Sequence, residues 1–201
     1  MADHYYSQAP SSRHDYQYFE TCLGGQSLRF KTDAGVFSKG RVDYGSRFLV
    51  ETFIDRVSHP QAILELGAGY GPISLALTAA YPQAQVIGVE INQRALTLAQ
   101  ANQDLNKIAN VEWLLQDAGH LALDRTFDHV VTNPPIRAGK QVIQSFVDRA
   151  YDLLQPGGSL WLVIQKKQGA PSMLKYMDQV FDNADKLVQD KGYWIIHSMK
   201  A

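Results

Sequence analysis

The stretch that decides the fold is AILELGAGYGP, residues 62–72. It opens with a short apolar run, which is typical of a strand buried on both faces of a sheet. Alternate glycines at 67, 69 and 71 follow, and glycine lets the backbone turn sharply. Pro72 then starts a segment with apolar positions at 73, 75, 76, 77 and 80, a spacing that predicts a helix over residues 72–81. The stretch therefore predicts a strand, a tight turn and a helix.

The same strand-and-helix unit recurs further along the chain. Apolar runs predict strands at residues 85–89, 111–115, 127–132 and 159–165, and helical spacing predicts helices at 92–106, 139–154 and 171–181. Pro156-Gly157-Gly158 reads as a stop signal before the fifth strand. Two last strands, 186–189 and 193–199, are separated by a short glycine turn and form an antiparallel hairpin. We therefore expect an α/β fold: a Rossmann-like, seven-stranded, mostly parallel sheet with helices on both faces.

The first 58 residues differ in character from the rest. Leu28, Phe30 and Thr32 alternate with polar residues, which predicts an exposed strand, and residues 46–57 have helical spacing. We therefore divide the chain into a short β-rich N-terminal extension, residues 1–58, and a main α/β domain, residues 59–201.

Composition narrows the class of protein. The chain has 201 residues, 45% of them hydrophobic and 19% charged, which is ordinary for a globular protein. Its single cysteine, Cys22, excludes an internal disulfide and a cysteine-based zinc site, and we expect no metal. The sequence shows neither a membrane-spanning apolar run nor a secretory pattern at its start, so we expect a cytoplasmic protein. With a net charge of −1, any nucleic-acid-binding surface must be local.

Polar or glycine clusters stand at the ends of four predicted strands, where open parallel sheets bind ligands. The glycine array is G-x-G-x-G rather than the dinucleotide pattern G-x-G-x-x-G, because Pro72 stands where the third glycine should fall. The ligand is therefore expected to lack a diphosphate. Glu90 can accept hydrogen bonds from both hydroxyls of a ribose, and Asp117 can accept one from an adenine amino group. The alternatives are a solvated acid at 90 and a turn acid before Gly119.

Asn133-Pro134-Pro135-Ile136 is the sharpest signal in the sequence. Two prolines fix two φ angles, and the residue before each proline is held extended. The Asn133 side-chain oxygen and the Pro134 carbonyl then form a rigid pair of acceptors for one NH2 group. Acceptors placed to match a tetrahedral nitrogen favour the transition state of an attack by that nitrogen. The alternative is a loop that only ends a strand.

These motifs resemble those of the class I S-adenosylmethionine-dependent methyltransferases, and within them the small-domain family that contains bacterial ribosomal RNA guanine-N2 methyltransferases. Residues 35–38, 43–46 and 163–170 also resemble this family. The resemblance implies a negative charge near the sulfonium and a cofactor site of Glu65, Gly67, Ala68, Gly69, Gly71, Glu90, Ile91, Asp117, Ala118 and Asn133. It implies a catalytic loop of Asn133, Pro134, Pro135 and Ile136.

The reaction implied is direct transfer of a methyl group from S-adenosylmethionine to N2 of a guanine in RNA, with 16S ribosomal RNA as the expected substrate. Many relatives that methylate adenine or glutamine carry an aromatic residue where this chain has Ile136, so adenine is less favoured. The alternatives are an adenine, a protein glutamine amide or a small-molecule amine as methyl acceptor, and a non-catalytic RNA-binding module. We expect no membrane partner, and a monomer or weak homodimer.

A basic segment supports an RNA partner. Residues 28–47 contain five basic and two acidic residues, with Phe30, Phe37 and Tyr44 interleaved. Such a segment can follow a nucleic-acid backbone and stack bases, and a solvated strand face is the alternative. A base in a duplex would have to be flipped out to reach Asn133. The expected RNA contacts are Phe37, Lys39, Arg41, Arg137, Lys140, Lys166 and Lys167.

Overall fold

The computed structural model describes residues 13–36 and 38–201. Its elements are, in chain order, β1 (Gln17–Leu23), β2 (Gln26–Thr32), α1 (Tyr44–Arg56), β3 (Ala62–Leu66), α2 (Pro72–Ala80), β4 (Gln85–Glu90), α3 (Gln93–Leu105), β5 (Val111–Leu115), η1 (Ala118–His120), β6 (Phe127–Thr132), η2 (Ile136–Ala138), α4 (Lys140–Leu153), β7 (Leu154–Gln165), η3 (Lys166–Gln168), α5 (Ala170–Phe181), β8 (Ala184–Asp190) and β9 (Tyr193–Met199).

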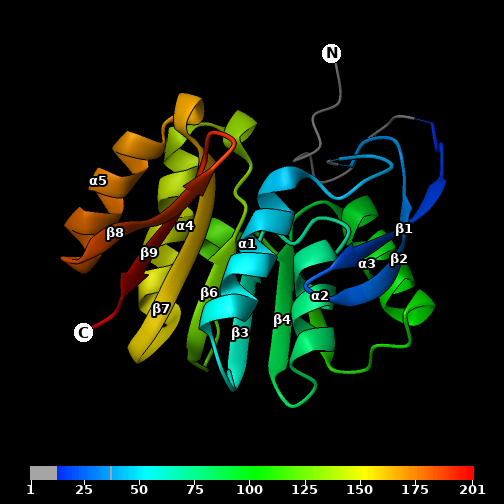
Figure 1. The fold of residues 1–201 in the computed structure, drawn as a ribbon, viewed down its shortest axis with the longest axis horizontal. Helices are drawn as coiled ribbons and strands as arrows, with labels where there is room; N and C mark the ends of the chain where they lie inside the picture. The colour runs from blue at the N-terminus through cyan, green and yellow to red at the C-terminus, as the bar shows by residue number, and fades with distance from the viewer. Residues whose placement is uncertain (1–12, 37) are drawn as a thin grey trace.

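Seven strands form one sheet in the order β5-β4-β3-β6-β7-β9-β8. Strands β3 to β7 are parallel, and β9 runs antiparallel to both of its neighbours. Figure 1 shows this sheet through the middle of the molecule, with the β8–β9 hairpin at one edge. The predicted α/β fold with a mostly parallel seven-stranded sheet and a C-terminal hairpin is therefore confirmed.

Helices cover both faces of the sheet because its strands are apolar on both sides. Ile63 and Val131 pack on one face with α1, α2 and α3, and Leu64 and Val130 pack on the other with α4 and α5. All four side chains are fully buried. Burying a side chain of this kind stabilises a fold by about 1.5–3 kcal/mol, so the alternation along each strand holds both helix layers in place.

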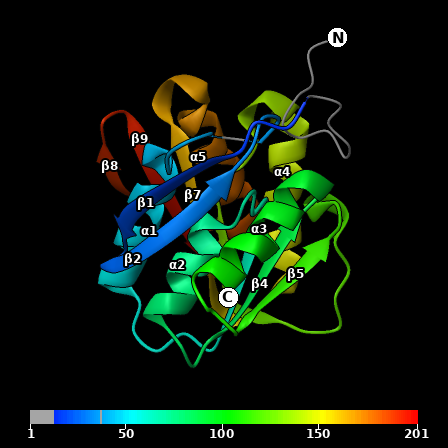
Figure 2. The ribbon, with the colours of Figure 1, turned by 90° about the vertical axis from the view of Figure 1, so that its right-hand side faces the viewer.

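The first two strands form a separate hairpin that lies against α2 and α3, as Figure 2 shows. Asn102 of α3 and Asn106, the C-cap residue of this helix, bond to the free edge of β2. Asn102 accepts a hydrogen bond from the Lys31 N–H at 2.6 Å and donates to the Lys31 carbonyl at 3.0 Å. Asn106 does the same with Arg29, at 2.9 and 2.7 Å. The edge is thereby satisfied and closed to other strands.

The strand predicted around residues 28–33 exists as β2, but the prediction that it is exposed is wrong on one side. Leu28, Phe30 and Thr32 are buried. The ring of Phe30 packs between those of Phe19 and Tyr70, with ring centroids 5.6 and 5.7 Å apart. The alternation in the sequence marks a covered face and a solvent face, and the main domain supplies the cover.

Strand β7 also differs from its prediction, because it begins at Leu154 and contains the expected stop signal. The Gly157 N–H donates to the Lys200 carbonyl, and the Lys200 N–H donates to the Gly158 carbonyl, both at 2.8 Å. Backbone pairing with the chain end beyond β9 therefore extends the strand through the glycines. Among the described helices, none is long and apolar enough to cross a membrane.

Candidate active site

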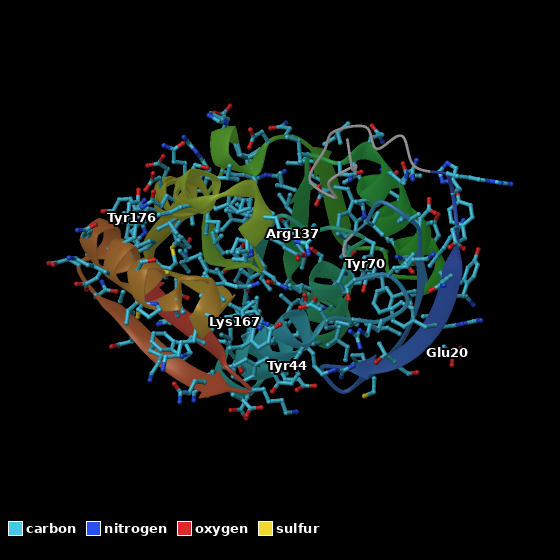
Figure 3. All side chains as sticks on the ribbon, turned by 90° about the horizontal axis from the view of Figure 1, so that it is seen from above. Glu20, Tyr44, Tyr70, Arg137, Lys167 and Tyr176 are labelled. Atoms are coloured by element: carbon cyan, nitrogen blue, oxygen red, sulfur yellow. The ribbon has the colours of Figure 1, made fainter. Side chains whose placement is uncertain are left out.

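A cavity of about 620 Å³ opens where β3, β4, β5 and β6 end. Figure 3 looks onto this end of the molecule, with Arg137, Tyr70 and Tyr44 labelled around the middle of the view. The cavity wall contains most of the residues expected from the sequence: Glu65, Gly67, Ala68, Gly69, Glu90, Ile91, Asp117, Ala118, Asn133, Pro134, Pro135, Ile136 and Arg137. The strand ends that the sequence singled out thus meet in one place.

The three glycines of the β3–α2 turn serve two different purposes. All have positive φ, at 79° for Gly67, 59° for Gly69 and 90° for Gly71. A Cβ at Gly69 would meet no atom within 4 Å, so its side faces open space along the cavity wall. A Cβ at Gly71 would lie 2.8 Å from the Trp113 ring. Gly71 does not line the cavity, and its role as a glycine comes from packing.

Glu90 is held at the end of β4 by backbone donors. Its carboxylate accepts hydrogen bonds from the Gly69 N–H and the Asn92 N–H, each at 2.8 Å. Burial raises the pKa of Glu90, and these hydrogen bonds act in the opposite direction. A carboxylate has about four acceptor sites, so sites remain for hydroxyl donors of a ligand. Glu90 and the open side of Gly69 together fit a nucleoside that approaches the backbone closely.

Glu65 is the most deeply buried acid in the cavity wall. It accepts hydrogen bonds from the N–H of Ser74, at 2.9 Å, and from the Ser74 hydroxyl. Burial raises the pKa of Glu65 to about 8, against the effect of the Ser74 hydrogen bonds. At neutral pH the protein groups alone therefore leave Glu65 largely protonated. The negative charge expected from the sequence develops at higher pH or beside a cation.

Asp117 both caps a short helical turn and lies in the cavity wall. Its carboxylate caps η1 by accepting from the Gly119 N–H at 2.9 Å, and its other oxygen lies 3.0 Å from His120 Nδ1. The residue also lines the cavity. It is therefore both a turn acid and a cavity residue.

The loop after β6 presents hydrogen-bond acceptors at the opposite wall. Pro134 is buried, and its carbonyl has no hydrogen-bond donor among the described residues, whereas the Pro135 carbonyl accepts from the Ala138 N–H at 2.9 Å. Asn133 Nδ2 donates to Asp43 Oδ1 at 3.1 Å and to Ser46 Oγ at 2.9 Å. Asn133 Oδ1 and the Pro134 carbonyl are therefore two acceptors of this loop that have no donor among the described residues.

The sequence analysis missed the cavity residues that come from distant segments. They are Val36, Ser38, Asp43 and Ser46 from the N-terminal part of the chain, Gln168 after β7, and Tyr193 at the start of β9. The resemblance of residues 35–38, 43–46 and 163–170 to the family was the available signal for all of these residues except Tyr193. No local pattern marked Tyr193, because its place depends on the β7–β9 pairing of Gln165 with Tyr193.

The basic segment at residues 28–47 is mostly committed to the fold, which corrects the prediction of a stacking groove there. Phe30 is fully buried. Arg29 pairs with Glu20 at 2.8 Å, and Arg47 donates to Thr21 Oγ1 at 2.7 Å. Lys39 pairs with Asp15, and Lys31 Nζ lies 3.9 Å from the centre of the Tyr16 ring, so the exposed Arg41 is the basic residue of this segment with neither an ion pair nor an aromatic contact among the described residues.

The remaining expected RNA contacts lie on the other side of the cavity mouth. Arg137 is exposed and lines the cavity, and Lys140, Lys166 and Lys167 are exposed in the next elements without an acidic partner among the described residues. Figure 3 shows Lys167 and Arg137 near the centre of the same face. Phe37 lies outside the described residues. No cluster of three or more His, Cys, Asp or Glu residues suited to a metal ion occurs in the described part of the chain.

Comparisons with known proteins agree with this geometry. Residues 27–197 match the model of the methyltransferase small domain family. An uncharacterized protein of Bacillus subtilis is 38% identical over the full length of both chains. The ribosomal RNA small subunit methyltransferase C of Vibrio cholerae is 27% identical over 88% of this chain and 51% of its own length.

Among solved structures, the 16S rRNA guanine-N2 methyltransferase of T. thermophilus, in complex with S-adenosylmethionine and guanosine, superposes with a TM-score of 0.84 at 28% identity. The match covers 96% of this chain and 52% of that one, so the chain spans about half the length of these ribosomal RNA methyltransferases. The family match and the cavity at the strand ends lead to one conclusion: the chain belongs to the methyltransferase small domain family of S-adenosylmethionine-dependent methyltransferases.

Proposed function

We propose that this protein methylates the exocyclic amino group, N2, of a guanine in RNA, with 16S ribosomal RNA as the substrate. The observation that carries the proposal is that one cavity joins Gly69 and Glu90 to the Asn133–Pro134 acceptors. A nucleoside donor site and a site for an NH2 group therefore lie side by side. The solved relative that binds S-adenosylmethionine and guanosine supports the same pairing.

Glu65, Gly67, Ala68, Gly69, Glu90, Ile91, Asp117 and Ala118 would hold the cofactor. The open side of Gly69 and the free acceptor sites of Glu90 fit a ribose. When bound, S-adenosylmethionine supplies a methyl group whose bond to sulfur breaks as a carbon–nitrogen bond forms, leaving a neutral thioether, and the nitrogen gives one proton to water.

The acceptor side works by orientation. Asn133 Oδ1 and the Pro134 carbonyl accept the two hydrogens of the NH2 group and turn its lone pair away from the base plane. Two rigid acceptors stabilise the developing positive charge on nitrogen more than the planar ground state. Ile136 and Tyr193 offer apolar surface for the base on the cavity wall. This account needs no general base before the attack.

The basic residues around the mouth suit the phosphates of an RNA. Arg41, Arg137, Lys140, Lys166 and Lys167 are exposed and carry positive charge next to or near the cavity. Positive charge at such a mouth attracts a polyanion and weakens with salt. A base that is paired in a duplex would have to leave its helix to reach Asn133 in this cavity.

The test is transfer of labelled methyl from S-adenosylmethionine to bacterial ribosomal RNA and to isolated small subunits. Digestion of the RNA to nucleosides should release N2-methylguanosine as the labelled product. Label found in adenine, or in ribosomal protein and not in RNA, would mean that one of the other methyl acceptors is the substrate. If neither the RNA nor the ribosomal protein becomes labelled, the assignment of RNA as substrate is refuted.

A further inference from the structure

We propose that Asp43 and Ser46, at the first turn of α1, are positioning residues that fix which end of the Asn133 amide faces the methyl acceptor. The inference rests on the proposed function, because it explains how the acceptor site is kept in its working state. It assigns a role to the N-terminal segment that neither the strand-end motifs nor the basic residues provide.

The two hydrogens of the Asn133 amide are both bound by the protein. Asn133 Nδ2 donates to Asp43 Oδ1 at 3.1 Å and to Ser46 Oγ at 2.9 Å. An amide nitrogen has two N–H donors, so the protein uses both. Only the oxygen end of the side chain remains for a ligand, and an NH2 group needs an acceptor there.

The reversed orientation of the Asn133 amide is excluded. An ionised carboxylate accepts hydrogen bonds and donates none. If the Asn133 amide were turned by 180°, its oxygen would face the Asp43 carboxylate and its nitrogen would face the methyl acceptor. Two acceptors would then oppose each other on one side and two donors on the other. Asp43 therefore selects the productive orientation because its Oδ1 can only accept a hydrogen bond, and Ser46 adds a second acceptor.

Asp43 and Ser46 are themselves held in place by the first turn of α1. Asp43 is the N-cap of α1, and the same Oδ1 accepts from the Ser46 N–H at 3.1 Å. Ser46 itself is only 4% exposed. A Cβ on Gly45 would lie 3.0 Å from the Tyr193 ring and 3.1 Å from Asp43 Oδ1. Glycine at this position therefore lets the first turn of the helix close tightly against β9 and the cavity.

Three substitutions at position 43 separate positioning from capping. Serine and asparagine are both good N-caps, whereas alanine is not. The hydroxyl of Asp43→Ser ends one bond short of the Oδ1 position, so it keeps the cap and loses Asn133. The side chain of Asp43→Asn reaches both partners with its oxygen. Asp43→Ala loses both contacts.

We expect Asp43→Ser and Asp43→Ala to lower kcat for RNA methylation by about tenfold or more, which corresponds to one lost orienting hydrogen bond. Asp43→Asn should recover most of the activity. Affinity for S-adenosylmethionine, measured by calorimetry, should stay within about twofold in all three, because the chain binds it through the other wall. Ser46→Ala should lower kcat less than Asp43→Ser. If Asp43→Ser equals the wild type while Asp43→Ala is impaired, capping alone explains the residue and the inference is wrong.

A second measurement needs no RNA substrate. In ¹⁵N-labelled protein, the Asn133 side-chain amide is the signal that Asn133→Ala lacks. Its two protons should exchange slowly with water in the wild type and faster in Asp43→Ser. The amide of Asn102, which bonds to the backbone of β2 and to Tyr70, serves as the internal control. Equal exchange at Asn133 in both proteins would overturn the inference. A wild type that transfers no methyl to RNA but shows this difference would refute only the proposed function.

Discussion

The two walls of the cavity are built in different ways. On the cofactor wall, formed by residues 67–69, Glu90 and Asp117, the carboxylate of Glu90 is held by backbone N–H groups of Gly69 and of Asn92, which is two residues away. On the acceptor wall, formed by residues 133–136, Asn133 is held by side chains that are 90 and 87 positions away in the chain. The Glu90 contacts form between the ends of two consecutive strands, whereas the Asn133 contacts require α1 to dock on the sheet.

The largest effect that we predict from this difference is a loss of methyl transfer while the binding of S-adenosylmethionine is unchanged. Asn133→Ala removes one of two acceptors for the NH2 group, so we expect the transfer rate to fall by about 10²- to 10³-fold. Affinity for S-adenosylmethionine should stay within about threefold by calorimetry, since the cofactor wall is intact. The matched control is Asn110→Ala, at an exposed loop position whose side chain donates to the Pro82 carbonyl. A parallel loss of binding in Asn133→Ala would mean that the two walls are not separable.

A substitution in the cofactor wall, Glu90→Ala, should weaken the binding of S-adenosylmethionine and leave the transfer rate nearly intact. Glu90→Ala removes the acceptor of the Gly69 and Asn92 N–H groups as well as the proposed ribose contact. A loss of charged hydrogen bonds of about 1.5–3 kcal/mol corresponds to a rise of about 10- to 100-fold in the Kd for S-adenosylmethionine. At saturating cofactor, the transfer rate should recover to within a few fold of the wild type. Comparable cofactor affinity in Glu90→Ala and Asn133→Ala would contradict the assignment of the two walls.

The two glycines of one turn sharpen the comparison within the cofactor wall. In Gly71→Ala, the new Cβ would lie 2.8 Å from Trp113, whose ring nitrogen donates to Gln103 Oε1 at 2.6 Å. Because the indole is tied in place and φ is 90°, we expect a loss of about 2–3 kcal/mol in unfolding free energy. Gly69→Ala meets no atom and should cost about 1 kcal/mol from its backbone conformation. Its methyl group instead enters the proposed cofactor space, so cofactor affinity should fall more than in Gly71→Ala. Denaturant unfolding of both variants measures the loss of unfolding free energy, and calorimetry measures the affinity for S-adenosylmethionine.

The same glycines show how much of the fold and of the candidate site could be predicted from the sequence. Their spacing predicted the strand, the turn and the helix, and the ends of the parallel strands predicted where the cavity opens. The spacing could not reveal that Gly71 is glycine because of Trp113, since that ring reaches the turn from a strand 42 positions further along. Motifs report local backbone needs, and packing between distant elements leaves no local trace.

The N-terminal segment shows the same limit more strongly. The alternation around Phe30 indicated a strand but not its cover, which consists of α3 and Tyr70. The basic residues of this segment look like a binding surface until Arg29 and Arg47 are seen bonded to Glu20 and Thr21. Asp43 and Ser46 lay in a stretch that resembles the family, yet their contact with Asn133 follows only from the docking of α1.

The last prediction concerns pH and isolates the contribution of Glu65 to cofactor binding. Burial raises the pKa of Glu65 from 4.5 to about 8, so the carboxyl is protonated at lower pH and ionises as the pH approaches 8. A sulfonium favours the ionised form, and binding below this range must therefore release a proton. The affinity for S-adenosylmethionine should then rise with pH, by at most about tenfold per pH unit, and level off above about pH 8.

The product, whose sulfur is an uncharged thioether, provides the comparison, because this sulfur does not favour ionisation of Glu65, and the affinity for the product should change less over the same range. Glu65→Gln keeps an acceptor for the two Ser74 donors and cannot ionise, so any slope that persists in this variant comes from other groups of the protein, such as Glu90, or from the ligand. Calorimetry in buffers of different ionisation enthalpy counts the released proton directly. Identical pH profiles for Glu65→Gln and the wild type would show that the protonation of Glu65 does not change when the cofactor binds, which would contradict the prediction.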